Sequence, residues 1–121
     1  MSNLFKRIDT VFLQVTDFEN AVEWYCSVLG FTVRWNDVTN GYATLNIGET
    51  PLTLVRKNEQ EVGHTNKHMQ FNFYTSDIEK AYQHLVQHDV KVEKVNQDGT
   101  FKWFEFYDLD GNRLGVCSFP E

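Results

Sequence analysis

The chain lacks the features that define several large classes of protein. Its 121 residues contain no run of about 20 apolar residues, the length that a membrane-spanning helix requires. The segment Met1 to Lys6 carries no apolar run of the kind found in secretion signals. We therefore expect a cytoplasmic protein with no membrane partner.

Cysteine is also scarce, because only Cys26 and Cys117 are present and they lie far apart in the sequence. Disulfide-stapled domains and zinc knuckles need more cysteines, in closer groups. We expect reduced thiols, with Cys117 as a small buried apolar residue rather than a nucleophile. Acidic residues outnumber basic ones, and the net charge of −6 repels a phosphate backbone. Nucleic acid is therefore not an expected partner.

Two apolar periodicities are present. Alternation predicts strands at 8–15, 31–36, 42–47, 52–56, 70–74, from 90 onward, 101–107 and 113–119. Spacings of three and four predict helices near 18–29 and 78–86, with Asp17 and Asp77 as N-caps. Gly30 is expected to end the first helix, and Asn40-Gly41 to form a tight hairpin because both residue types tolerate positive φ.

The same order of elements occurs twice. Placing Thr10 over Gln70 superposes the strand and cap of one half on those of the other, and Glu19 and Ala21 then meet Glu79 and Ala81. This internal repeat of about 60 residues predicts a pseudo-twofold α+β fold of two βαβββ modules in tandem. We assign module one to 1–57, a polar linker to 58–66 and module two to 67–121, all within one domain. Each module begins β-α-β, which implies a parallel crossover.

Two motifs resemble those of a known family. The run Val15-Thr-Asp-Phe-Glu-Asn-Ala-Val-Glu-Trp-Tyr25, followed by Val28-Leu-Gly-Phe31, is similar to the opening of a vicinal oxygen chelate module. Asp108-Leu-Asp-Gly-Asn112 resembles its closing turn, with Leu109 in place of proline. The resemblance covers essentially the whole chain and implies the glyoxalase, bleomycin resistance and extradiol dioxygenase fold, in which curled mixed sheets surround a cavity.

The resemblance also implies where metal ligands would stand. The four positions fall on Thr10, Thr53, Gln70 and Gly115, and only Gln70 offers a side chain suited to coordination. We therefore expect no metal and no cofactor. His84 and His88 are four residues apart on a helix but are expected to face solvent, and His64 and His68 are expected at the surface. Asp108 and Asp110 are explained by a turn rather than a calcium loop.

Strand alternation predicts which side chains line the cavity. They are Phe12, Gln14, Asn46, Thr53, Val55, Gln70, Asn72, Tyr74, Trp103, Glu105, Tyr107, Gly115 and Cys117. Trp35 is ambiguous, because it shares the parity of Phe31 and Val33 yet lies where a bulge could turn it. Such an aromatic, amide-rich wall suits a flat or amphipathic organic molecule. The alternative is that these aromatic residues pack together or form a dimer interface.

These features lead to a hypothesis with alternatives. The leading one is a metal-free, homodimeric protein that binds or sequesters a small aromatic or cationic ligand such as an antibiotic, as bleomycin resistance proteins do. The rival is a lyase, isomerase, transferase or dioxygenase of the same superfamily, using an unusual ligand set or Glu105 as acid or base. A third hypothesis is a structural partner protein with a collapsed cavity.

Overall fold

The computed structural model describes residues 4–57 and 69–121, so the predicted linker 58–66, His64 and His68 lie outside the described residues. The chain divides into two compact units, Met1–Val62 and Gly63–Glu121. Each unit holds one helix and one four-stranded mixed sheet. The predicted α+β fold of tandem βαβββ modules is therefore confirmed, whereas the assignment of both modules to one domain stays a prediction.

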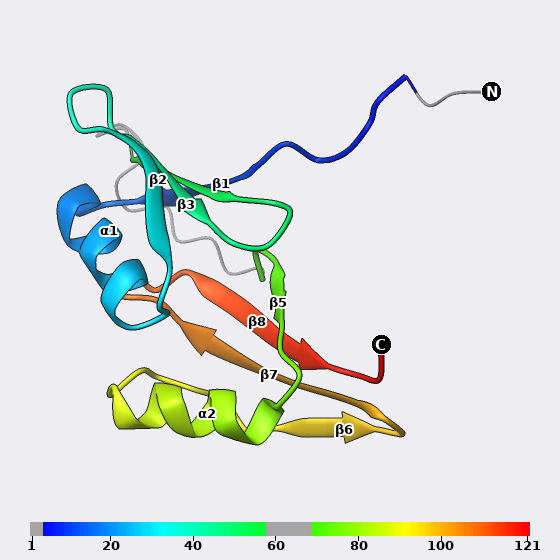
Figure 1. Ribbon diagram of the computed structural model, residues 1–121. Coiled ribbons are helices and arrows are strands. Elements are labelled where there is room, and N and C mark those ends of the chain that lie inside the picture. The colour runs from blue at the N-terminus through cyan, green and yellow to red at the C-terminus, as the bar shows by residue number, and fades with distance from the viewer. Residues whose placement is uncertain (1–3, 58–68) are drawn as a thin grey trace. The chain divides into compact units, whose positions relative to one another are not determined.

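The first unit contains β1 (Val11–Val15), α1 (Phe18–Ser27), β2 (Thr32–Asp37), β3 (Tyr42–Asn46) and β4 (Leu52–Arg56) (Figure 1). Its strand order is β1-β4-β3-β2. Strands β1 and β4 are parallel, and the other neighbours are antiparallel. The long connection that the parallel pair requires runs from β1 through α1, β2 and β3 to β4.

The second unit repeats this plan with β5 (Asn72–Tyr74), α2 (Ile78–Gln87), β6 (Asn96–Asp98), β7 (Phe101–Tyr107) and β8 (Arg113–Ser118). Its strand order is β5-β8-β7-β6, with β5 and β8 parallel. Each strand therefore has a counterpart at the same place in the first sheet, and rows of side chains in the two sheets can be compared position by position.

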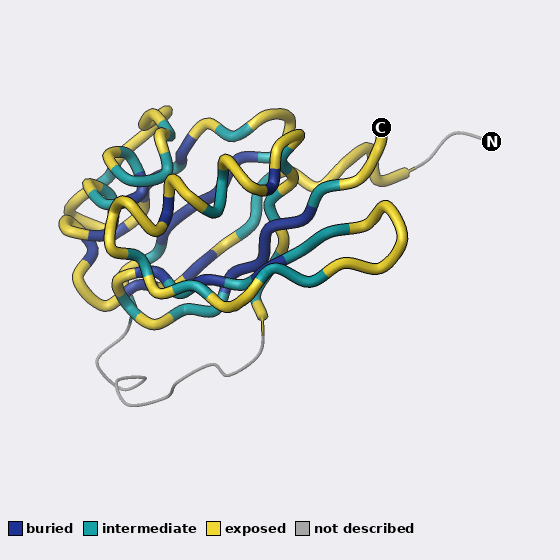
Figure 2. The backbone as a smooth tube through the Cα atoms, turned by 90° about the horizontal axis from the view of Figure 1, so that it is seen from below, coloured by how far each residue is buried: buried dark blue, intermediate teal, exposed yellow. Residues whose placement is uncertain are grey.

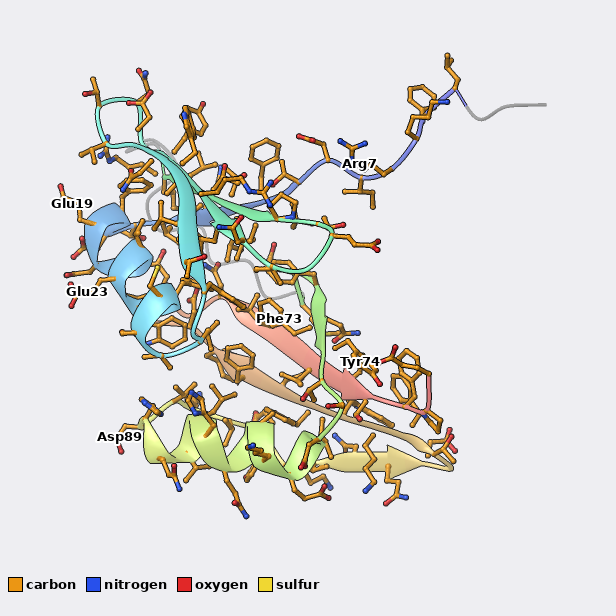
Figure 3. All side chains as sticks on the ribbon, in the orientation of Figure 1. Arg7, Glu19, Glu23, Phe73, Tyr74 and Asp89 are labelled. Atoms are coloured by element: carbon orange, nitrogen blue, oxygen red, sulfur yellow. The ribbon has the colours of Figure 1, made fainter. Side chains whose placement is uncertain are left out.

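Local sequence signals explain where the helices begin and end. The side chains of Asp17 and Asp77 accept hydrogen bonds from the backbone N–H groups of Asn20 and Lys80, as N-caps do. After α1, Gly30 takes a left-handed conformation with φ of 82°. After α2 the left-handed residue is Asp89, with φ of 58°, which Figure 3 shows at the end of the helix.

Several predicted boundaries are wrong. The strand expected from Val90 onward begins at Asn96, and only an isolated bridge from Val92 to Phe106 precedes it. The Asn40-Gly41 hairpin is looser than predicted, because of this pair only Gly41 has positive φ, at 76°. The backbone N–H of Gly41 instead donates to the carbonyl oxygen of Asp37 at 2.8 Å, which closes a longer loop.

Most of the buried residues come from one side of each sheet and from the helix that covers it, whereas Thr53 and Cys117 are buried on the other side. In Figure 2 the buried stretches lie along the central strands, and most loops are exposed. Figure 3 shows Glu19 and Glu23 projecting from α1, and both side chains are exposed. Within the part of the chain that the structure describes, neither helix is long and apolar enough to cross a membrane. The core residues are Leu13, Val15, Phe18, Ala21, Tyr25, Ala43, Leu45, Leu52, Leu54, Ile78, Leu85, Phe104, Phe106, Leu114 and Val116.

Candidate functional site

Each sheet has a second face, which we call the open face, formed by the residues that alternate with the buried core residues. On the first sheet, strand register aligns one residue from each strand in a transverse row. The row runs Phe12, Thr53, Thr44 and Trp35, and we call it the threonine row. Its two outer members are large exposed rings, at 64% and 53% exposure, and its two inner members are short hydroxyl side chains.

The hydroxyl groups of this row form a continuous hydrogen-bonded chain. Thr44 Oγ1 lies 3.0 Å from Thr53 Oγ1, which lies 2.8 Å from Thr10 Oγ1. Thr10 Oγ1 in turn donates to the carbonyl oxygen of Pro51 at 3.0 Å. Thr53 is only 5% exposed, so its hydrogen bonds replace those that water would make.

Trp35 joins this row because of a β-bulge. The register of β2 against β3 shifts between Val33 and Trp35, so that Val33 pairs with core-facing Leu45 whereas Trp35 pairs with Thr44. The ambiguity in the sequence is thereby resolved toward the open face. Neighbouring strands lie about 4.8 Å apart, so the rings of Phe12 and Trp35 are based about 14 Å apart, with the threonines between them.

Asn46 lies on the same face and is held by two neighbours. Arg34 Nε donates to Asn46 Oδ1 at 2.6 Å, and Asn46 Nδ2 donates to Thr32 Oγ1 at 3.0 Å. Both partners come from β2. The amide is therefore fixed in orientation, and it brings a guanidinium group to this end of the open face.

On the second sheet, the corresponding row is Asn72, Gly115 and Glu105. A Cβ atom on Gly115 would lie 1.9 Å from Asn72 Oδ1 and 2.5 Å from Met69 Sδ. A side chain at position 115 would therefore displace the side chains of Asn72 and Met69, which pack over Gly115. The side chains of Asn72 and Met69 thus occupy the space over the centre of this row.

Glu105 has a cationic partner. Arg113, which flanks it on β8, donates to Glu105 Oε1 through Nε at 2.9 Å and through its terminal nitrogen at 2.5 Å. Hydrogen bonding to Glu105 raises the pKa of the Arg113 guanidinium. Glu105, which the sequence left as a candidate acid or base, is therefore held in an ion pair. Next to this pair, Lys91 lies over the ring of Tyr107, 4.7 Å from its centroid.

The same sheet carries a hollow of about 430 Å³ lined by Met69, Asn72, Asp98, Phe101 and Trp103. The rings of Phe101 and Trp103 lie 5.5 Å apart, so the hollow has an aromatic side, and Asp98 contributes a carboxylate. This volume falls in the range of small-molecule sites. Of the cavity-lining residues that alternation predicted, Asn72 and Trp103 line this hollow.

Tyr74 does not line this hollow. Its hydroxyl donates to the carbonyl oxygen of Phe119 at 2.8 Å, and it lines a separate hollow of about 450 Å³ near the start of α2. Figure 3 shows this side chain near the C-terminal end of β8. Gln70 precedes β5, and its backbone N–H donates to the carbonyl oxygen of Arg113 at 2.9 Å.

The predicted site residues thus fall on two surfaces. Phe12, Gln14, Asn46, Thr53 and Val55 belong to the open face of the first sheet, and Asn72, Tyr74, Trp103, Glu105, Tyr107, Gly115 and Cys117 to that of the second. The sequence did not point to several further residues that contact these side chains or line the hollow, which are Arg34, Thr44, Met69, Asp98, Phe101 and Arg113. Thr44 and Arg113 share strand parity with predicted residues, so alternation alone could have identified them.

The donor set at the implied metal positions does not fit a divalent ion. The hydroxyl groups of Thr10 and Thr53 are hydrogen-bonded to each other, and that of Thr10 also bonds to the carbonyl oxygen of Pro51. Gly115 has no side-chain atom that could act as a ligand. Neutral hydroxyl groups bind such ions weakly compared with imidazole, thiolate or carboxylate groups. Among residues 4–57 and 69–121, no three His, Cys, Asp or Glu side chains gather as a metal site would require.

The histidines of α2, the two cysteines and the aspartates of the last turn were the remaining candidates for metal binding or catalysis. His84 and His88 are exposed, with ring centroids 4.3 Å apart, and His88 Nδ1 lies 2.8 Å from the carbonyl oxygen of His84. Cys26 and Cys117 are not joined in a disulfide, and their thiols are free. Asp108 is buried, and its carboxylate accepts hydrogen bonds from the backbone of Asp110 and Asn112, which makes it part of a turn.

Two βαβββ units whose sheets each leave one face open define a protein of the glyoxalase-like class. A family model described as the Glyoxalase/Bleomycin resistance protein/Dioxygenase superfamily matches residues 7–116, and the chain belongs to that superfamily. The resemblance found in the sequence is therefore confirmed.

Individual relatives agree with this assignment. The uncharacterized protein YraH of Bacillus subtilis is 29% identical, over 86% of this chain and 91% of its own length. The structure of TnmS3, an antibiotic binding protein from a Streptomyces species, is similar with a TM-score of 0.83 and 19% identity, covering 98% of this chain and 100% of that one. Lactoylglutathione lyase from Agrobacterium tumefaciens has a TM-score of 0.76 and 16% identity, covering 96% of each chain. At such identities the two structures show a shared fold.

Proposed function

We propose that this protein binds a small, flat organic molecule on the open faces of its sheets, without a metal ion, and thereby sequesters or carries it. The observation that carries the proposal is the pairing of aromatic rings with small or recessed polar groups on each face. On the first sheet the rings are Phe12 and Trp35, with threonines between them. On the second sheet Phe101 and Trp103 line a hollow large enough for such a molecule.

The ligand class we propose is an aromatic or cationic compound of the antibiotic type. Aromatic rings provide apolar area and stacking, and a net charge of −6 favours cations over anions at long range. The description of TnmS3 as an antibiotic binding protein supports the same class. We also propose that the protein works in the cytoplasm as a homodimer, which light scattering after size exclusion would test.

Tryptophan fluorescence provides the test of binding, since Trp35 and Trp103 lie on the two open faces. We would titrate a panel of aromatic antibiotics, including glycopeptides such as bleomycin, and follow quenching. Trp103→Ala should weaken a ligand of the hollow by about 1–3 kcal/mol, the cost of a lost aromatic anchor, and leave the fold intact. Trp35→Ala is the matched control for the other face.

The outcome also separates binding from catalysis. If no member of the panel quenches fluorescence or shifts the melting temperature, the antibiotic class is excluded. If protein purified without chelator carries stoichiometric zinc, manganese, nickel or iron, and Gln70→Ala abolishes its retention, the metal-free proposal is wrong and an enzyme of the superfamily is favoured.

A further inference from the structure

The hydroxyl chain on the first sheet has a direction that the geometry determines. A threonine hydroxyl has one hydrogen to donate, and a carbonyl oxygen can only accept. Thr10 Oγ1 lies 3.0 Å from the carbonyl oxygen of Pro51 and 3.5 Å from that of Val11, so the hydrogen of Thr10 points to a backbone carbonyl, with the shorter contact to Pro51. Two oxygens at that distance without a hydrogen between them would repel each other.

Each further link follows from the first. Because the hydrogen of Thr10 is already used, the 2.8 Å contact to Thr53 requires Thr53 to donate. The hydrogen of Thr53 is then used as well, so the 3.0 Å contact between Thr53 and Thr44 requires Thr44 to donate. All three hydrogens therefore point along the chain toward Pro51, and the oxygen at its outer end, Thr44 Oγ1, has lone pairs but no hydrogen for a ligand.

We infer that the open face of the first sheet recognises a hydrogen-bond donor, and that an arylmethylamine in its ammonium form fits it better than an aromatic carboxylate. This inference rests on the proposed function and adds the polarity of the ligand. The rings of Phe12 and Trp35 flank the threonines and would hold the aromatic part, and a cation near these rings gains from their negative faces.

One group on the same face opposes this preference. Arg34 donates to Asn46, which stands two residues from Thr44 on β3, and its guanidinium group would favour a carboxylate. A carboxylate held by Arg34 would depend on that side chain and would not need the Thr44 oxygen. The two modes can therefore be separated by substitution.

The experiment uses three probes that share one ring system: 2-naphthylmethylamine, 2-naphthoate and the neutral 2-naphthalenemethanol. Affinities are measured by calorimetry on the full chain, with chemical shifts of Thr44 and Trp35 to locate binding. We expect the amine to bind about tenfold more tightly than the carboxylate. Thr44→Val, which keeps the shape and removes the oxygen, should reduce amine binding about tenfold, whereas Thr44→Ser should retain it.

Thr10→Val tests the direction of the chain from a distance. Without the Thr10 oxygen, Thr53 is free to donate to Thr44, and Thr44 can then donate outward. Carboxylate affinity should rise, and the ratio of amine to carboxylate affinity should fall about fivefold or more. Thr10→Ser should keep the original ratio. A purely structural effect would weaken both probes together and would leave their ratio unchanged.

The outcomes distinguish this inference from the proposal beneath it. If the alcohol and the carboxylate bind as tightly as the amine, or if Thr44→Val leaves the ratio unchanged, the inferred polarity is wrong and ligand binding stands. If none of the three probes binds or shifts a resonance of this face, ligand binding on the first sheet is itself contradicted. A carboxylate preference that Arg34→Gln abolishes would identify the guanidinium as the recognition group instead.

Discussion

The two sheets share a strand order and differ in what their open faces present. Phe12, Thr53 and Thr44 in the first sheet correspond by register to Asn72, Gly115 and Glu105 in the second. The first row presents rings and hydroxyl oxygens. In the second row, the side chains of Asn72 and Met69 occupy the space over Gly115, and Glu105 forms an ion pair with Arg113. Duplication has thus preserved the backbone plan while the chemistry of each face has been set separately, because open-face side chains are not constrained by the core.

The cores differ in a complementary way. One of the two buried residues on β3 is Ala43, whereas its counterpart on β7 is Phe104. On the helices the sizes are reversed, with Tyr25 on α1 and Leu85 on α2. At these two positions the first unit therefore takes its larger buried side chain from the helix, and the second unit takes it from the sheet.

The largest expected effect comes from removing that side chain in the second unit. Phe104 is fully buried, and its ring meets that of Tyr82 edge to face at 5.2 Å. Phe104→Ala should lower the free energy of unfolding by about 3–5 kcal/mol, measured by urea denaturation, because it removes apolar burial and leaves a cavity.

A second variant tests the comparison of the cores. Adding Leu85→Tyr to Phe104→Ala copies the arrangement of the first unit and should recover part of the lost stability. If Leu85→Tyr lowers stability equally with and without Phe104→Ala, the two positions do not exchange volume, and the proposed correspondence fails.

A smaller effect is expected from the threonine row. Thr53→Val keeps the shape of the side chain but breaks the hydroxyl chain, leaving Thr44 without its acceptor. We expect a loss of about 1–2 kcal/mol in denaturant titrations, the cost of losing buried hydrogen bonds. Thr53→Ser is the control, because it retains the hydroxyl, and a loss as large in Thr53→Ser would assign the effect to packing of the methyl group.

The sequence predicted the fold well because repeated periodicity and caps are local signals. Asp17, Asp77 and Gly30 mark helix ends through contacts within a few residues, and the structure has all three in those places. The strand expected after Val90 was placed too early, since valine-rich alternation there does not reveal that the continuous ladder with β7 begins only at Asn96, after an isolated bridge from Val92 to Phe106.

The site was predictable only as a set of residues that share a face. Alternation grouped Glu105 with the open face, but its ion pair with Arg113 depends on how β7 and β8 align. The position of Trp35 depends on a bulge, and the filling of the space over Gly115 depends on Met69, which lies outside any strand. These are contacts between distant segments, which one sequence does not encode as a periodic pattern.

The ends of the two helices provide the next comparison. The left-handed residue is Gly30 after α1 and Asp89 after α2. Gly30→Ala should cost about 1 kcal/mol although its Cβ would meet no atom within 4 Å, because only the backbone conformation is strained. Asp89→Gly should stabilise by about 0.5–1 kcal/mol in the same denaturation assay.

The negative charge of Asp89 contributes to the stabilisation expected from Asp89→Gly. A carboxylate at a helix C-terminus is unfavourable, so Asp89→Asn should recover the electrostatic part of the gain and keep the backbone strain. Equal stability of Asp89→Asn and the parent, with a gain in Asp89→Gly, would assign the whole effect to conformation. A loss in Asp89→Gly would show that the side chain makes a contact worth more than the strain.

The smallest effect at neutral pH belongs to the two thiols, one in each unit. Burial raises the pKa of both Cys26 and Cys117 in the folded protein above the unfolded value. A raised thiol pKa means that the folded state holds its proton more tightly. This stabilisation is complete below the unfolded pKa and is lost as pH rises through the folded pKa. The free energy of unfolding should therefore fall over an alkaline window starting near pH 8.5, the usual thiol value.

Two variants test the contribution of each thiol to this fall. Cys117 is the more buried of the two, so Cys117→Ala should flatten the fall in the free energy of unfolding more than Cys26→Ala. The reverse ranking would show that exposure of the thiol does not set its titration.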